Sequence, residues 1–199
     1  MKTYRAPRSS GRGEIREKGS RFLGVLLPVT SEGAATAALD AVRREFPSAT
    51  HHCFAWRIGR RAVERSSDDG EPSGTAGQPI LRVLRGGDRS DVLVVVVRWY
   101  GGTKLGKGGL ARAYAAAARQ AAEAVAWTVR APTVGGCVTV GYQQIGVLKR
   151  LVNPPLVSLV GEDYGVRVRL TLRIREDQLD SFEAALADLG ATFEVATEN

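Results

Sequence analysis

The stretch RWYGGTKLGKGG, residues 98–109, follows an unbroken apolar run at Val92–Val97 and precedes an alanine-rich segment that begins at Leu110. The apolar run predicts a central strand buried on both faces, because short β-branched runs of this kind are typical of such strands. After the glycines, apolar residues recur at helical spacing and predict an amphipathic helix to about Trp127. The glycine-rich stretch therefore joins a buried strand to a helix, and this junction decides the fold of the first half of the chain.

Such a junction is suited to binding an anion. A helix N-terminus presents unpaired N–H groups and the positive end of the helix dipole, and a glycine-rich turn has no Ser, Thr, Asp or Asn to cap them. Lysines and Arg112 add full charges. The candidate anion- or nucleic-acid-binding residues are Arg98, Tyr100, Gly101, Gly102, Lys104, Gly106, Lys107, Gly108, Gly109 and Arg112. The alternative is that the glycines only form turns and the lysines only keep the chain in solution. The stretch does not match a Walker loop, because no Ser or Thr follows the Gly-Lys pair at residues 106 and 107.

A second polar loop spans residues 68–79, with three glycines, two prolines and three carboxylates but no large apolar side chain. Loops of this length are often functional or disordered. Its carboxylates either bind a divalent cation, pair with Arg98, Lys104 and Lys107 if the two loops meet, or lie solvated. The residues expected to adjoin the anion site are Asp69, Glu71, Ser73, Gly74 and Thr75. No base stands beside Ser73 or Thr75 in the sequence, so the catalytic residues of any reaction stay unknown.

The rest of the first 130 residues predicts alternating strands and helices. Residues 1–21 hold seven Lys or Arg and predict a mobile arm. Further predictions are a strand at residues 22–29, a helix at 31–46, a strand at 52–58, an arginine-rich turn at 59–61 and a short helix at 79–84 with Gly86 just past its end. Alternation along the strand sends His51 and Cys53 to one face and His52 to the other, so we expect no zinc site.

From Thr133 onward the pattern changes to short elements in the order βαββαβ, which is typical of ferredoxin-like domains. The predicted elements are strands at residues 134–140, 156–160, 166–174 and 192–195 and helices at 142–151 and 179–189, with a turn at 162–164 between the two middle strands. We place the domain boundary at Val129–Pro132, which gives domains 1–130 and 133–199. The expected fold class is therefore α+β.

Composition excludes several classes of protein. The hydrophobic fraction of 44% with 25% charged residues is that of a globular chain, and no apolar run approaches the roughly 18 to 20 residues of a membrane span. The basic N-terminus lacks the apolar stretch of a secretory signal. Cys53 and Cys137 are too few for a disulfide framework, so we expect reduced thiols in a cytoplasmic protein.

The net charge of +7 is unevenly distributed. Residues 1–132 hold 22 Lys and Arg against 12 Asp and Glu, a balance of +10, whereas residues 133–199 hold 6 against 9, a balance of −3. Such asymmetry indicates that one half contacts a polyanion and the other does not, although a solvated basic surface would have the same composition.

Two long motifs carry a family resemblance: DDGEPSGTAGQPIL at residues 68–81 and RWYGGTKLGKGGLARAY at residues 98–114. Together they resemble the signatures of the YigZ/IMPACT family, strongly over residues 16–130 and more weakly in the tail. The resemblance implies an N-terminal domain like domain 2 of ribosomal protein S5, followed by a domain like the C-terminal domain of elongation factor G. Both folds recur in proteins that contact RNA or the ribosome.

The resemblance also frames the expected function. Eukaryotic relatives act in translational control through a kinase pathway and carry an RWD domain; this sequence lacks that domain, so only the general link to translation is carried over. We expect RNA or the ribosome as partner, with no cofactor, no metal and no membrane. One alternative is an enzyme acting on a phosphorylated small molecule or nucleotide, because small-molecule kinases of the S5-like superfamily hold phosphates on a similar loop; the serines of that loop are missing here. Another is a protein-binding adaptor that uses the C-terminal sheet.

Overall fold

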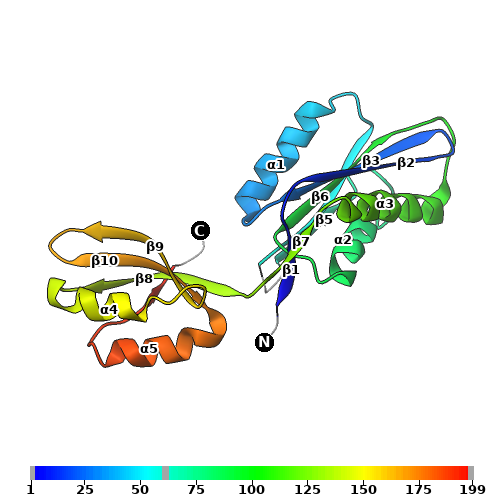
Figure 1. Cartoon of the computed structure of the whole chain (residues 1–199). Helices are drawn as coiled ribbons and strands as arrows, with labels where there is room; N and C mark the ends of the chain where they lie inside the picture. Colours follow the sequence, from blue (N-terminus) through cyan, green and yellow to red (C-terminus); the bar gives the residue numbers. More distant parts are fainter. Residues whose placement is uncertain (1–2, 60–62, 197–199) are drawn as a thin grey trace. The chain divides into compact units, whose positions relative to one another are not determined.

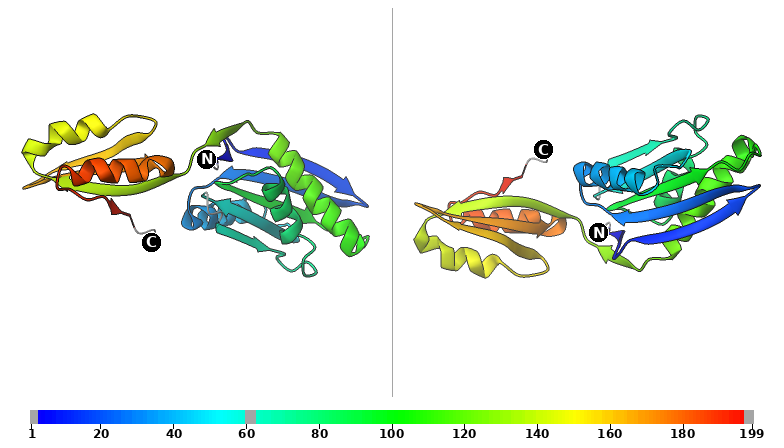
Figure 2. Two further views of the ribbon diagram at one scale, coloured as in Figure 1. Left: turned by 90° about the horizontal axis from the view of Figure 1, so that it is seen from below. Right: turned by 90° about the horizontal axis from the view of Figure 1, so that it is seen from above.

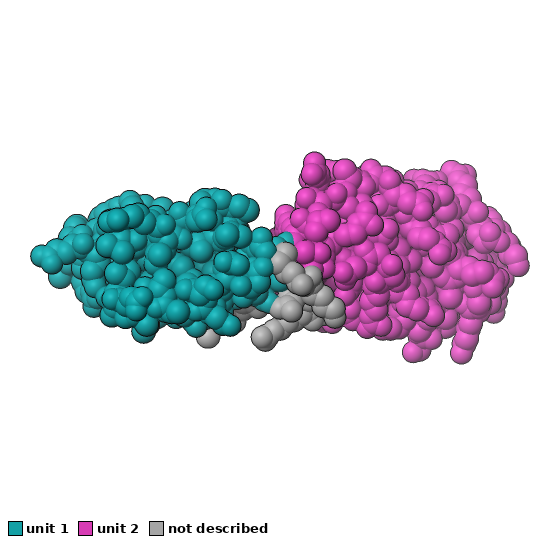
Figure 3. All heavy atoms as spheres, turned by 60° about the horizontal axis from the view of Figure 1, so that its bottom comes forward, with its two compact units in different colours: residues 1–2, 131–199 teal, residues 3–130 magenta. Residues whose placement is uncertain are grey.

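The computed structural model describes residues 3–59 and 63–196. The chain divides into two compact units, one of Thr3–Arg130 and one that begins at Ala131, which Figure 3 colours separately. Two hydrophobic clusters lie in the first unit and one lies in the second. Each unit therefore has a core of its own.

The first unit is built on a five-stranded antiparallel sheet (Figure 1). In spatial order its strands are β2 (Gly11–Glu17), β3 (Ser20–Pro28), β6 (Val92–Trp99), β4 (His51–Ile58) and β5 (Val63–Ser67). The prediction of a central strand buried on both faces is confirmed in β6. Its alternate residues enter two different cores, Val94 with its neighbours on one face and Val95 with its neighbours on the other.

Helices cover both faces of this sheet (Figure 2). Helix α1 (Glu32–Glu45) packs on one face, and α2 (Gly77–Gly86) and α3 (Gly106–Glu123) pack on the other. The predicted helix at 31–46 is confirmed, and Ser31 caps it by accepting a hydrogen bond from the Ala34 amide at 3.2 Å. The glycine-rich stretch therefore ends on the face that carries α2 and α3.

The predicted limits of helices α3 and α2 were wrong. Helix α3 begins at Gly106 and not at Leu110, because the partly buried Leu105 packs on the core and anchors the first turn. It ends at Glu123 and not at Trp127, whose indole N–H donates to the Ala122 carbonyl while its backbone joins a strand. Helix α2 is also longer than predicted, and it contains Gly86 instead of ending before it.

The prediction of a mobile N-terminal arm was wrong within the described residues. Strand β1 (Tyr4–Pro7) pairs with β7 (Trp127–Arg130), and β2 pairs along its whole length with β3. Strand β2 has few apolar side chains because its backbone itself packs against α3: a Cβ at Gly13 would lie 2.4 Å from the Gln120 Cβ. Strand β5 was not predicted, and the predicted turn at 59–61 falls largely on residues 60 and 61, outside the described residues.

The second unit has the predicted order βαββαβ. It comprises β8 (Thr133–Val140), α4 (Ile145–Leu151), β9 (Val157–Tyr164), β10 (Val168–Arg175), α5 (Leu179–Ala187) and β11 (Glu194–Val195), with 3-10 turns before both helices. The antiparallel strands lie in the order β11-β8-β10-β9. The turn predicted at 162–164 was misplaced, since β9 continues to Tyr164, which pairs with Val168. Buried and exposed residues alternate along β10, which begins at Val168 and not at the predicted residue 166; Val166 is 99% exposed.

Candidate functional site

The two polar loops meet through a buried ion pair. Arg98, near the end of β6, donates from Nη1 to Oε1 of Glu71 in the loop before α2, and only 5% of Arg98 and 9% of Glu71 is exposed. The same Glu71 oxygen accepts a hydrogen bond from the Tyr114 hydroxyl of α3 at 2.7 Å. One carboxylate oxygen therefore links both loops to the helix that follows the glycines. This pairing was among the alternatives that the sequence left open.

Arg98 is fixed from several sides. Its guanidinium carbon lies 5.2 Å from the ring centre of Phe22 and 5.4 Å from that of Tyr100, within the range of cation–π contacts. Its Nη2 donates to the Ser20 hydroxyl at 3.3 Å. The guanidinium of Arg98 therefore lies buried beneath the glycine loop and does not face solvent. The neighbouring Tyr100, in contrast, is 47% exposed.

The glycine loop is held against the turn between β2 and β3. The Gly101 amide donates to Ser20 Oγ at 3.1 Å, and a Cβ at Gly101 would lie 2.0 Å from the carbonyl carbon of Gly19. Real Cβ atoms do not approach backbone so closely, so only glycine allows this contact. The loop therefore leaves β6 along a path that the neighbouring turn fixes.

The start of α3 is open. Its N-cap residue is Leu105, which provides no side-chain cap, and within the described residues no side chain accepts a hydrogen bond from the first-turn amides. Lys104, Lys107 and Arg112 are exposed. Within residues 3–59 and 63–196 these three cations have no ion-pair partner, so the structure does not join the two lysines to the acidic loop. Three uncompensated charges and a set of free amides thus lie at one end of one helix.

Unlike the cations at the start of α3, Asp68 is hydrogen-bonded within its own loop. Its carboxylate accepts hydrogen bonds from the amides of Gly74, Ala76 and Gly77, each at 2.8 Å. Burial by itself would raise the pKa of Asp68, but the three amide donors outweigh burial and hold the pKa below its ordinary value. Asp68 therefore closes the N-terminus of α2, whereas the N-terminus of α3 stays open.

Asp69 is also engaged by the protein. Its Oδ2 accepts from the His52 amide at 2.7 Å, and its Oδ1 lies 3.4 Å from Nη2 of Arg43. All three carboxylates of the acidic loop thus have partners. In the described part of the chain no three His, Cys, Asp or Glu side chains are grouped so that they could hold a metal ion.

The other residues of the acidic loop divide by exposure. Thr75 is buried, and its hydroxyl donates to the Pro72 carbonyl at 2.6 Å. Ser73 and Gly74 are exposed. Of the five residues predicted to adjoin the site, Glu71 and Thr75 therefore shape the loop from inside, and Ser73 and Gly74 offer the accessible surface.

The histidines and Cys53 divide between the sheet faces as predicted. Cys53 lies in the core with α2 and α3 and donates from Sγ to the Asp68 carbonyl at 2.9 Å. Burial raises the pKa of its thiol, so the sulfur stays protonated at neutral pH. His51 Nδ1 lies 2.7 Å from the Asp69 carbonyl oxygen. These groups hold the acidic loop on β4.

The sequence did not indicate two polar groups that contact the Arg98–Glu71 ion pair, the Ser20 hydroxyl and the Tyr114 hydroxyl. Tyr114 is expected on the apolar stripe of the helix, and it does pack edge-on against Phe22, with ring centres 5.2 Å apart. Its hydrogen bond to Glu71 joins residues 43 positions apart. No local pattern signals such a pair, because the fold alone brings the two residues together.

None of the helices in residues 3–59 and 63–196 combines the length and apolarity that crossing a membrane requires. This finding agrees with the absence of long apolar runs in the sequence.

Comparisons with known proteins give the family. The Impact N-terminal domain matches residues 18–122, and a domain of unknown function, DUF1949, matches residues 138–191. The IMPACT family member YigZ of Escherichia coli is 36% identical over 174 residues, which cover 86% of this chain and 85% of that protein. An IMPACT family member of Haemophilus influenzae is 32% identical over 94% of this chain and 93% of its own length.

A solved structure covers both units. The crystal structure of a protein described as hypothetical is 32% identical, covers 100% of both chains and has a TM-score of 0.75. The two motifs that suggested the family, residues 68–81 and 98–114, both lie inside the Impact N-terminal match and form the two loops joined by Arg98 and Glu71. The chain belongs to the IMPACT family.

Proposed function

We propose that this protein is a cytoplasmic RNA- or ribosome-associated regulator of translation that binds RNA through the start of α3. The observation that carries the proposal is the open N-terminus of α3, flanked by Lys104, Lys107 and Arg112 without partners in the described residues. Free amides and full positive charges at one helix end suit a phosphate group. Such contacts bind the nucleic-acid backbone, which is common to all sequences.

Family membership supports the link to translation, since the IMPACT resemblance implies that role. The same resemblance underlies a proposal about fold: the first unit would be like domain 2 of ribosomal protein S5, and the second like the C-terminal domain of elongation factor G. The element order βαββαβ of the second unit is compatible with the ferredoxin-like part of this proposal.

The competing proposal is an enzyme that acts on a phosphorylated small molecule or nucleotide at the same helix end. The open amides of α3 favour it as much as they favour RNA. A thermal-shift series with nucleotides, with and without magnesium, separates the two. Stabilisation by one nucleotide at micromolar concentration supports the enzyme, and stabilisation by polyanions alone supports the RNA-binding protein.

The direct test is a Lys104→Ala, Lys107→Ala double variant titrated with an unstructured RNA at several salt concentrations. We expect weaker binding for every RNA sequence and a salt slope reduced by roughly one to two, with stability within about 0.5 kcal/mol of the parent because both side chains are exposed. The matched control is Arg16→Ala, Arg44→Ala, which removes two exposed charges from β2 and α1. Unchanged RNA affinity in the folded lysine variant would contradict the proposal.

A further inference from the structure

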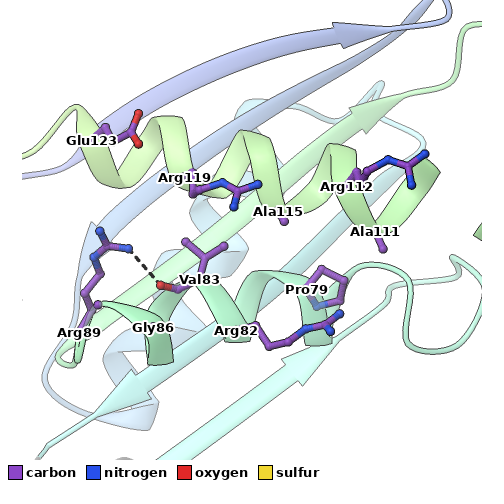
Figure 4. Close-up of a pocket in the computed structure, with 11 residues that line it drawn as sticks. Pro79, Arg82, Val83, Gly86, Arg89, Ala111, Arg112, Ala115, Arg119 and Glu123 are labelled. Carbon is purple, nitrogen blue, oxygen red and sulfur yellow. Dashed lines mark hydrogen bonds between the residues drawn. The ribbon is translucent and has the colours of Figure 1, made fainter. Parts of the chain in front are cut away.

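A groove of about 530 Å³ lies between α2 and α3, on the side of these helices away from the sheet (Figure 4). Helix α3 contributes Arg112, Ala115, Arg119 and Glu123, which recur every three or four residues and so form one stripe along the helix. Helix α2 contributes Arg82 from the opposite wall. The proposed function uses only Arg112 of these residues, so most of the groove has no assigned role.

The groove carries positive charge that the protein does not neutralise. Arg82, Arg112 and Arg119 are exposed, and none has an ion-pair partner within the described residues. The one carboxylate of the lining, Glu123, lies at one end of the stripe (Figure 4). Like charges gathered at one site repel one another, and a bound anion relieves that repulsion.

A fourth arginine, Arg89, has a structural role. Its Nη1 donates to the Val83 carbonyl at 3.0 Å, and its guanidinium carbon lies 5.0 Å from the Trp127 ring centre. Burial and the nearby charge of Arg5 lower the pKa of Arg89 from its ordinary value, yet an arginine remains charged at neutral pH. Arg89 therefore adds a fixed charge to the end of the groove nearest Glu123.

The lining is suited to a backbone of phosphates and not to stacked bases. It contains alanine, glycine, proline and valine between the arginines but no aromatic side chain on which a base could stack. Guanidinium groups bind phosphate oxygens in bidentate fashion. Seven helical residues separate Arg112 from Arg119, a rise of about 10.5 Å. Successive phosphates of one strand advance by about 3.4 Å along the axis of a duplex, so the two arginines are far enough apart to contact different phosphates.

We propose that this arginine groove, defined by Arg82, Arg112 and Arg119, holds the sugar-phosphate backbone of a single RNA strand. The inference rests on the proposed function and extends it from the start of α3 along the helix. A groove of this volume is the size of a small-molecule pocket, so one strand enters it and a duplex does not. Binding in the groove is independent of base sequence, because only the backbone is contacted.

The test uses the full chain with Arg82→Gln and Arg119→Gln, two groove residues outside the loop site. Gln keeps most of the side-chain length and removes the charge. The control is Arg16→Gln, Arg44→Gln, whose exposed side chains belong to β2 and α1. We expect the groove variant to bind unstructured RNA about tenfold more weakly, with a salt slope lowered by about 1.4, since each single-strand phosphate contact contributes about 0.7. Melting curves of both variants should match the parent.

The outcomes separate this inference from the proposed function. If RNA binding is weaker in the lysine variant but unchanged in the groove variant, the proposal that the groove binds RNA is wrong and the proposed function still holds. The reverse pattern supports RNA binding in the groove and shows that Lys104 and Lys107 do not contact the RNA. Absence of RNA binding by the parent chain overturns both. Two results would assign the groove to a different anion and contradict the proposal that it holds an RNA strand. One is micromolar binding of a mononucleotide that the groove variant loses, and the other is competition by polyglutamate equal to that by RNA.

Discussion

Glu71 shows how a single buried carboxylate organises this protein. Its Oε1 receives hydrogen bonds from Arg98 and Tyr114, and its side chain comes from a loop in which Ser73 and Gly74 are exposed. Two charges buried in contact are stable only as a pair, because either one left alone lacks water and partner alike. The open surface at the start of α3 therefore depends on an interior pair that no ligand needs to touch.

Removing Arg98 should consequently destabilise the fold. We expect Arg98→Ala to lower the free energy of unfolding by about 3–5 kcal/mol, since it leaves Glu71 buried without its counter-charge. Combining it with Glu71→Gln should restore part of that loss, because the unpaired charge is then absent. Urea unfolding of both single variants and the double variant measures the coupling. A loss below about 1 kcal/mol in Arg98→Ala would show that the pair is not needed.

The lowered pKa of Asp68 predicts how the stability of the fold depends on pH. Its pKa is depressed in the folded chain, so its contribution to stability is fully present above the unfolded pKa of about 4 and is lost as pH falls through the lower folded pKa. Asp68→Asn should cost about 0.5–2 kcal/mol at pH 7, as loss of a helix cap does. The difference from the parent should shrink as pH falls below about 4. Unfolding curves at pH 7, 5, 4 and 3 test this, with Ser73→Ala as the exposed control; a difference that is constant with pH would contradict it.

At the scale of elements, the strands and helices with strong periodic patterns were predicted and the others were not. Strand β6 and helix α1 follow their apolar patterns, as does the alternation of β10. Strand β2 was missed because it packs through glycine backbone and not through apolar side chains, and Gly13 contacts α3 directly. Periodicity detects side chains that bury themselves, so it cannot detect a strand that a helix covers by close backbone approach.

The same reasoning explains which parts of the candidate site were predictable. The glycines and lysines before Leu110 form one continuous motif, and the sequence alone indicated an uncapped helix start. The arginine groove was not predicted, because Arg82 and Arg119 lie on different helices and nothing local connects them. The contacts of Tyr114 and Ser20 also depend on residues far along the chain. Local motifs therefore identified the end of one helix, and the fold was needed to find the surface beside it.

At the scale of the whole molecule, the division into two units coincides with the division of charge. The first unit has a sheet with helices on both faces, and its residues 3–130 hold 21 Lys and Arg against 12 Asp and Glu, a balance of +9. The second has its own core of residues from its sheet and two helices, and it carries a balance of −3. Because electrostatic contacts with phosphates supply most of the sequence-independent binding of a nucleic acid, the two units should differ in their affinity for RNA.

This difference gives the last prediction. Residues 1–130 and 131–199, prepared separately, should each unfold cooperatively, since each holds a hydrophobic core. The first piece should bind unstructured RNA with an affinity close to that of the full chain, and the affinity should fall as salt rises, because released counterions drive the binding. The second piece should bind at least tenfold more weakly. Titrations of both pieces at two salt concentrations measure this. Equal RNA binding by residues 131–199, or binding by residues 1–130 that salt does not weaken, would mean that the arginines and lysines around α3 are not what attracts RNA.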